Sequence, residues 1–140
     1  MYKRQLLEMD ARVLAIDPAE MEQDVLDHPK LTHIRRRGHE VKKRDFQNVR
    51  WLMADISMVP NYTLDTVSEI ASHDSVDFKG IVLTLKLSNW EMLDSVPKWV
   101  ERVKGLGFKY VRTRQLAFNR QEICLIAAKD KFVLRSSKRN

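Results

Sequence analysis

Four charged residues at the ends of predicted strands are the most informative feature of this 140-residue sequence. Asp17 and Asp55 each close an apolar run. Lys86 lies near the end of a third run, and Glu122 begins the last one. Ligands of open α/β sheets bind outside the carboxyl ends of the strands, so we expect these side chains to converge on one rim. Because titratable groups that meet at such a rim can hold a polar ligand and carry acid–base chemistry, the four residues form the candidate site.

Alternating strands and helices must position these residues. The apolar runs predict strands at residues 12–17, 31–34, 49–55, 80–87, 109–116 and 122–128. Helical spacing predicts one helix at 18–26, one capped by Thr63, and one at 90–106 that Pro97 interrupts near Ser95. A short loop at 118–121 allows the last strand to run antiparallel. The pattern predicts an α/β fold with an open, largely parallel sheet and a basic tail that frays from Lys131.

The composition is that of one globular domain spanning residues 1–140. Hydrophobic residues make up 44% of the chain, with only four Gly and four Pro. No apolar run approaches the length of a membrane helix and no signal peptide opens the chain, which predicts a cytoplasmic protein. A single cysteine, Cys124, excludes an intrachain disulfide and a Cys-cluster zinc site, and the four histidines show no ligand spacing, so no metal is expected.

The net charge of +6 is concentrated in one segment. Residues 30–50 hold eight basic and two acidic residues, whereas the bases and acids of the rest of the chain cancel. A local surplus of positive charge favours an anionic partner, and nucleic acid is the commonest one. The alternative is a solvated, charged surface loop. The candidate RNA-binding residues are Arg36, Arg37, Lys42, Lys43 and Arg44, joined by Trp90, which follows Lys86 and could line a substrate cleft.

Four stretches of sequence resemble a known family. They are VLAIDPAEM, VRWLMADIS, GIVLTLKL and RQEICLIA, and the resemblance is nearly continuous over residues 11–128. In these stretches the chain resembles the FtsJ-like 2'-O-ribose RNA methyltransferases, particularly the branch that modifies a cytidine of large-subunit ribosomal RNA. The resemblance implies a Rossmann-like fold with an antiparallel last strand, S-adenosylmethionine as cofactor and ribosomal RNA as substrate.

The hallmark of that family is a Lys-Asp-Lys-Glu tetrad. Its Asp lies in a W-x-x-x-D setting, which Trp51 and Asp55 match. Its second Lys lies in an L-K-L setting, matched by Lys86, and its Glu is matched by Glu122. The resemblance implies that Asp55, Lys86 and Glu122 are catalytic. It also implies that Asp17 holds the ribose hydroxyls of the cofactor, with Asp55 assigned to the cofactor site as well.

The residue types suit the chemistry that the resemblance implies. A ribose hydroxyl is a very weak acid, so methyl transfer from a sulfonium needs the oxygen oriented and its proton given a destination. Lys86 could do both. Burial and a neighbouring cation would lower its pKa, whereas Asp55 and Glu122 would raise it. The two carboxylates would also position Lys86 and the hydroxyl.

The family's first segment has no match in this sequence. It comprises the first tetrad Lys, which would be the cation beside Lys86, a first strand, and a Gly-rich loop that passes the methionine part of the cofactor. The only paired glycines, Gly105 and Gly107, end a predicted helix. Where related enzymes place an acid beside the adenine, this chain has Arg36 and Arg37.

The first five residues suggest why that segment is missing. Met1-Tyr2-Lys3-Arg4-Gln5 corresponds to the translated end of a common transposon sequencing adaptor, so residues 1–5 are expected to be non-native. The chain is then the C-terminal part of a methyltransferase domain that lacks its central first strand. Loss of that strand should split the sheet and leave a poorly stable, inactive chain.

A second class of function is left open by the sequence. A non-catalytic RNA-binding α/β module could keep the basic segment and lose cofactor binding, and Arg36 and Arg37 favour it. Such a module would bind RNA with strong salt dependence and would not bind S-adenosylmethionine. A methyltransferase for small molecules is a further alternative, which Lys86 and Glu122 together argue against.

Overall fold

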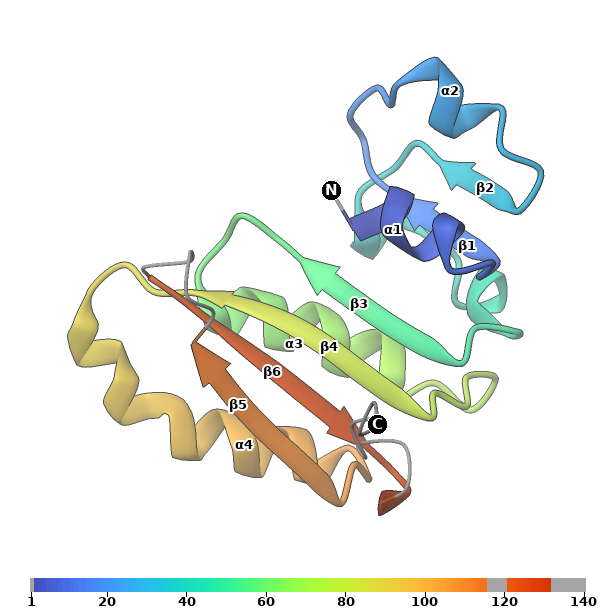
Figure 1. The fold of residues 1–140 in the computed structure, drawn as a ribbon. Coiled ribbons are helices and arrows are strands. Elements are labelled where there is room, and N and C mark those ends of the chain that lie inside the picture. Colours follow the sequence, from blue (N-terminus) through green and yellow to red (C-terminus); the bar gives the residue numbers. More distant parts are fainter. Residues whose placement is uncertain (1, 116–120, 132–140) are drawn as a thin grey trace, which may run out of the picture. The chain divides into compact units, whose positions relative to one another are not determined.

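The computed structural model describes residues 2–115 and 121–131 of the chain. The chain divides into two compact units, residues 1–45 and 46–140. Each unit has its own sheet and is described by itself (Figure 1). No helix in the described part is long and apolar enough to cross a membrane.

The first unit is a two-stranded parallel sheet with short helices. Strands β1 (Val13–Ile16) and β2 (Leu31–Ile34) pair in parallel over four residues each. Helix α1 (Tyr2–Glu8) precedes β1, and α2 (Gln23–Leu26) connects the strands. A 3₁₀ turn, η1 (Gly38–Glu40), follows β2.

The helix predicted at 18–26 is wrong in its first half. The backbone amide of Ala19 donates to the Asp17 carboxylate over 3.0 Å, which holds residues 17–19 in a turn. An aspartate that bonds the amide two residues ahead offers the backbone an alternative to a helix. The helix therefore begins only at Gln23.

The second unit is a four-stranded mixed sheet. Its strands are β3 (Trp51–Asp55), β4 (Gly80–Lys86), β5 (Tyr110–Gln115) and β6 (Glu122–Ala128), in the spatial order β3-β4-β6-β5. Strands β3 and β4 are parallel, and β6 runs antiparallel to both β4 and β5. The antiparallel direction of the last strand is confirmed. The helical elements are η2 (Lys43–Phe46), which leads into this unit, α3 (Pro60–Ala71), η3 (Trp90–Ser95) and α4 (Val96–Gly105).

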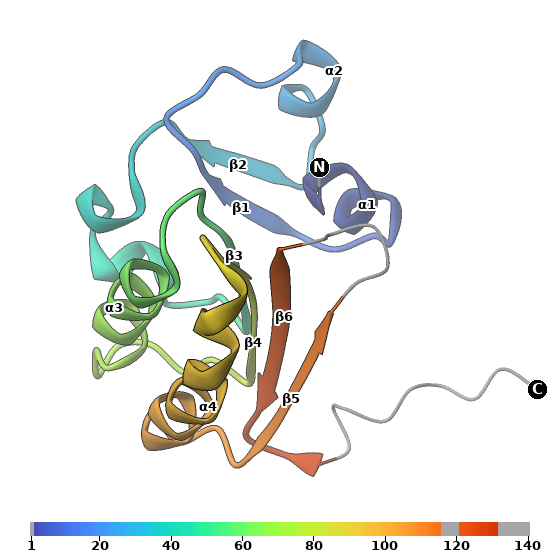
Figure 2. The ribbon, with the colours of Figure 1, turned by 90° about the vertical axis from the view of Figure 1, so that its left-hand side faces the viewer.

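Both long helices of this unit cover the same face of the sheet (Figure 2). Alternate residues of β4 and β6 point toward them, and Ile81, Leu83 and Leu125 are fully buried there. Val67 of α3 and Val103 of α4 supply the other side of this core. The core therefore lies on the side of the sheet that the two long helices cover, and the remaining strand residues point to the other side.

The 3₁₀ turn η3 ends at Ser95 and α4 begins at Val96 with Pro97 in its first turn, so the predicted break near Ser95 is confirmed. Gly107 follows α4 with a φ of 93°, a conformation that favours glycine at a helix end.

Two predictions about this unit are wrong. Helix α3 begins at Pro60, whose fixed φ suits the first helical position, so Thr63 lies inside the helix instead of capping it. Trp51, expected in the core, is 39% exposed because it lies on the face without a helix, whereas Trp99 is buried as expected. The predicted loop at 118–121 and the tail from Lys131 lie outside the described residues, apart from Gln121 and Lys131 themselves.

Candidate functional site

A lysine between two carboxylates forms the candidate site of the second unit. Lys86, the last residue of β4, lies directly opposite Glu122, the first residue of β6, in the antiparallel register. The Lys86 Nζ donates to Glu122 Oε1 over 2.9 Å and lies 3.2 Å from Asp55 Oδ1. Three of the four residues expected at one rim thus meet.

The register of the strands explains this meeting. Asp55, which ends β3, is in register with Thr84, and Lys86 follows Thr84 by two residues on the same face of the sheet. Across the other edge of β4, the amide of Leu87 donates to the carbonyl of Gln121 over 2.8 Å and holds the start of β6 in place. A continuous apolar strand that ends in lysine therefore delivers that lysine to two acids from its neighbours.

The site is half-open to solvent and its lysine is held in the charged form. Side-chain exposure is 31% for Lys86, 25% for Glu122 and 42% for Asp55. The hydrogen bond to Glu122 raises the pKa of Lys86 most, and Asp55 raises it further, while burial acts in the opposite direction. The net pKa lies above the ordinary value, so Lys86 in this geometry is an ammonium that donates hydrogen bonds.

Trp90 stands just after the site. It opens η3, four residues beyond Lys86, and its side chain is 50% exposed. The turn that carries it is fixed by the Asn89 side chain, which accepts from the amide of Met92 over 3.2 Å. An exposed indole on a fixed turn is compatible with the expected role in lining a substrate cleft, which stays a prediction.

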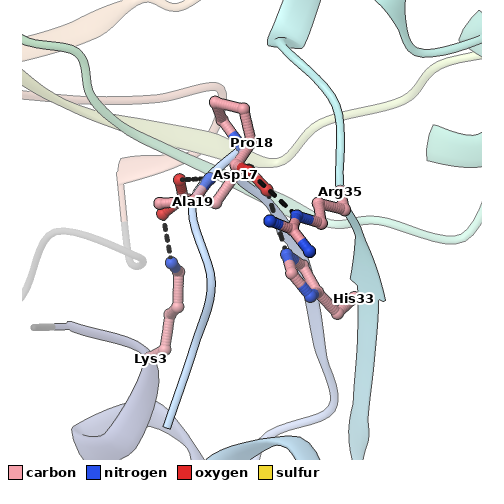
Figure 3. Close-up of polar contacts among 6 residues, drawn as sticks. All are labelled: Lys3, Asp17, Pro18, Ala19, His33 and Arg35. Carbon is pink, nitrogen blue, oxygen red and sulfur yellow. Dashed lines mark hydrogen bonds and ion pairs between the residues drawn. The ribbon is translucent and has the colours of Figure 1, made fainter.

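Asp17, the expected ligand of the cofactor's ribose, directly follows β1 in the first unit (Figure 3). Its Oδ2 accepts from Lys3 Nζ over 2.6 Å and its Oδ1 accepts from the amide of Ala19. The hydrogen bond from Lys3 is the main reason that the pKa of Asp17 lies below its ordinary value, against a smaller opposing effect of burial. Its backbone carbonyl lies 3.0 Å from His33 Nε2 of β2. The carboxylate is thus held at both oxygens, one of them by Lys3.

Lys3 is the residue of this cluster that sequence analysis missed. It belongs to the five residues expected to be non-native, and no spacing rule links it to Asp17, 14 residues away. Only the packing of α1 beside β1 brings the two together (Figure 3).

The basic segment surrounds η1 and contains several exposed cations. Arg36, Arg37, Lys42 and Arg44 are exposed, and no ion pair to them is found among the described residues, whereas Lys43 is half-buried. Glu40 turns back toward its own loop, where it accepts from the amide of Arg37 over 2.7 Å. Arg35, just before them, pairs with Glu20 over 3.0 Å. Arg36, Arg37, Lys42 and Arg44 are thus available to an anion, and the RNA-binding role of the predicted residues stays a prediction.

Cys124 and the acidic residues do not form a metal site in the described part of the chain. No group of three or more His, Cys, Asp or Glu side chains is placed to hold a metal ion there. Cys124 lies half-buried in β6, and burial raises the pKa of its thiol, so it is a poor nucleophile at neutral pH.

Comparisons with known proteins identify the fold. No protein-family model matches the chain, and no curated protein matches it either. Two solved structures of variants of the 16S rRNA (adenine(1408)-N(1))-methyltransferase from Catenulisporales acidiphilia are similar, with TM-scores of 0.58 and 0.54 at 15% identity. They match over 90% of this chain and 78% and 80% of theirs. A possible exported protein from Bordetella parapertussis is also similar, with a TM-score of 0.53 at 13% identity, over 86% of this chain and 54% of that one.

At this level of identity the likeness concerns the fold alone. The chain has a mixed α/β fold similar to that of an S-adenosylmethionine-dependent methyltransferase. Its function must be argued from the site.

Proposed function

We propose that this chain is part of an S-adenosylmethionine-dependent methyltransferase that acts on RNA, and that it methylates a ribose 2'-hydroxyl. The observation that carries the proposal is Lys86, held between Asp55 and Glu122 at the carboxyl end of β4. Open α/β folds bind their ligands at this end of the strands. The fold similarity to two rRNA methyltransferase structures supports the general class.

Lys86 is suited to hold a ribose hydroxyl in line for methyl transfer. Its ammonium donates a hydrogen bond that orients the hydroxyl oxygen, whereas accepting the hydroxyl proton requires the neutral amine. Asp55 and Glu122 fix the position of Nζ through the contacts described above. A second cation beside Lys86 would lower its pKa and let it accept the proton itself, which is the place we propose for the family's first lysine.

The residues present fit one end of the cofactor. S-adenosylmethionine supplies the methyl group, and a carboxylate at the end of β1 is suited to accept hydrogen bonds from its ribose hydroxyls, as proposed for Asp17. Because Lys3 already bonds that carboxylate, it would have to leave first. The sequence contains no Gly-rich loop for the methionine end.

We further propose that the intact protein supplies a strand that this chain lacks. The described strands form two separate sheets, and β3 pairs with β4 alone, so its other edge has no partner among them. An unpaired edge flanked by the exposed Trp51 and Met53 is a site for strand addition. The parallel first strand of a methyltransferase fold would pair there.

The test is methyl transfer by the protein completed with its own upstream sequence. We expect labelled methyl groups from S-adenosylmethionine to appear in RNA as a 2'-O-methylnucleoside after complete digestion. Lys86→Ala should abolish the product while binding of the cofactor survives. Lys79→Ala, which removes a lysine at the opposite end of β4, is the matched control and should leave the product unchanged. Product in the base instead of the ribose, or full activity of Lys86→Ala, would contradict the proposal.

The exposed cations of the basic segment favour one alternative, a non-catalytic RNA-binding module. It predicts RNA affinity that falls steeply with salt and no affinity for S-adenosylmethionine even in the completed protein. Isothermal titration of the completed protein with the cofactor separates the two functions.

A further inference from the structure

The face of the four-stranded sheet that α3 and α4 leave uncovered is largely apolar and partly exposed. We call it the open face, and it consists of Trp51, Met53, Asp55, Gly80, Val82, Thr84, Lys86, Glu122, Cys124, Ile126, Ala128, Tyr110, Arg112 and Arg114. Trp51 and Met53 are each 39% exposed and Tyr110 is 37% exposed. In the described part of residues 46–140, both long helices lie on the other side of the sheet (Figure 2). Exposed large apolar side chains that gather on one face are typical of an interaction site, so the open face is suited to a partner.

The register arranges the open face in rows that run across the sheet. The first row ends in Trp51 on β3 and Tyr110 on β5, at opposite edges. The second row likewise ends in Met53 and Arg112. The third row ends in Asp55 and Arg114. Each row has its middle on β4 and β6, where the residues are apolar, small or uncharged: Gly80, Ala128, Val82, Ile126, Thr84 and Cys124.

Charge is divided between the two edges of this face. The acidic edge is Asp55 on β3, and the basic edge is Arg112 and Arg114 on β5. Both arginines are exposed, and no ion pair to either is found among the described residues. The acid and Arg114 end the same row, about three strand spacings or roughly 14 Å apart.

We propose that the open face binds a second copy of this chain, face to face, in a two-fold symmetric dimer. A two-fold axis parallel to the strands, midway between two stacked sheets, places β3 of one copy opposite β5 of the other and leaves every row in register. Asp55 then faces the partner's Arg114 twice, once in each direction. The same operation stacks Trp51 against the partner's Tyr110 and packs the uncharged middle of one face against that of the other.

The charge pattern favours a second copy over single-stranded nucleic acid. An aromatic, basic sheet face can stack bases, but this face also carries Asp55, and Glu122 lies at its end beside Lys86. These carboxylates would repel a phosphate backbone, whereas each of them can meet a cation in a symmetric dimer. The inference does not rest on the methyltransferase proposal. Because this face also carries Asp55, Lys86 and Glu122, the dimer would cover the proposed catalytic site, and only the monomer could admit an RNA ribose to it.

The test is the mass of the full chain in solution, measured by light scattering and sedimentation at micromolar concentrations. We expect a species of twice the 16.5-kDa chain mass. Arg114→Glu and Asp55→Lys should each raise the Kd of the homodimer about tenfold or more, because each replaces two attractive contacts by two repulsive ones. Lys98→Glu on α4 makes the same change of charge away from the open face and should leave the Kd unchanged.

Mixing the two variants gives the most specific result. In a heterodimer, Lys at position 55 of one chain faces Glu at position 114 of the other, and the remaining Arg114 faces the remaining Asp55. The mixture should therefore dimerise about as well as the unaltered chain, while circular dichroism checks that each variant is folded. If the unaltered chain is a monomer at micromolar concentrations, the proposal is wrong. A mixture that dimerises as weakly as each variant alone would also overturn it. So would a monomer that binds single-stranded RNA and loses this binding on Arg112→Glu.

Discussion

Gly80→Ala tests whether the Trp51 ring lies on the sheet as the structure has it. A Cβ at position 80 would lie 2.5 Å from Trp51 Cη2 and 2.8 Å from Cε3, and closer still to Cζ3. These distances are far inside van der Waals contact, so the indole must leave its place. Trp51 is 39% exposed, which allows it to swing outward at the loss of its contact with β4. Overpacking of this kind costs about 1–3 kcal/mol, reduced by about 0.4–1 kcal/mol because alanine restricts the unfolded chain more than glycine does.

We therefore expect Gly80→Ala to lower the free energy of unfolding by about 1–2 kcal/mol, measured by urea denaturation followed by circular dichroism. Gly105→Ala is the matched control, since nothing lies within 4 Å of its added Cβ. It ends α4 and should gain up to about 1 kcal/mol. In a Trp51→Ala background the cost of Gly80→Ala should vanish. An equal cost with and without the indole would refute the reasoning, as would no cost in the unaltered chain.

Three smaller predictions concern polar groups. The buried hydroxyl of Thr63 has no hydrogen-bond partner among the described residues, so Thr63→Val should raise the free energy of unfolding by up to about 1 kcal/mol in the same urea assay, and a loss of stability would contradict it. The carboxylate of Asp77 accepts hydrogen bonds from Lys129 and Lys79. Together they lower its pKa to about 2, and the bond from Lys129 has the larger effect. Its ion pairs should persist above pH 3.8 and be lost as the pH falls through about 2, and carboxyl NMR should show Lys129→Met raising this pKa. Lys3→Ala should likewise raise the pKa of Asp17 toward its ordinary value, whereas an unchanged titration would show that Lys3 does not hold that carboxylate.

The cluster of Asp55, Lys86 and Glu122 could be predicted because it depends on strand ends alone. Asp55 closes β3, Lys86 closes β4 and Glu122 opens β6, so parallel and antiparallel pairing at the same rim brings them together. The apolar runs define these ends well. The local pattern of apolar runs was thus enough to predict a contact that the register of the strands determines.

Other features depend on contacts between distant segments, which a local pattern does not contain. The sequence predicts Trp51 to be a core residue, but the residue is 39% exposed because its burial depends on which face of the sheet the helices cover. The balance of effects on the pKa of Lys86 depends on distances to two carboxylates, and in the described geometry these outweigh burial. The contact of Lys3 with Asp17 requires the placement of α1.

Local competition explains the remaining errors. The turn held by Asp17 prevents a helix at Pro18, although the sequence there is compatible with one. Pro60 starts α3 three residues before Thr63 because a proline at the first helical position needs no amide donor. At each place a helix could begin at either of two residues, Pro18 or Gln23 in the first and Pro60 or Thr63 in the second. The local sequence does not decide between them.

In the function that we propose, Asp55, Lys86 and Glu122 belong to a methyltransferase site whose first lysine and first strand lie upstream of this chain. The most direct measurement is to sequence the genomic DNA upstream of the Leu6 codon and translate it in frame. The account predicts a lysine, then a strand, then a Gly-rich loop. A genuine start codon with no coding sequence before it would contradict the account and favour the RNA-binding module.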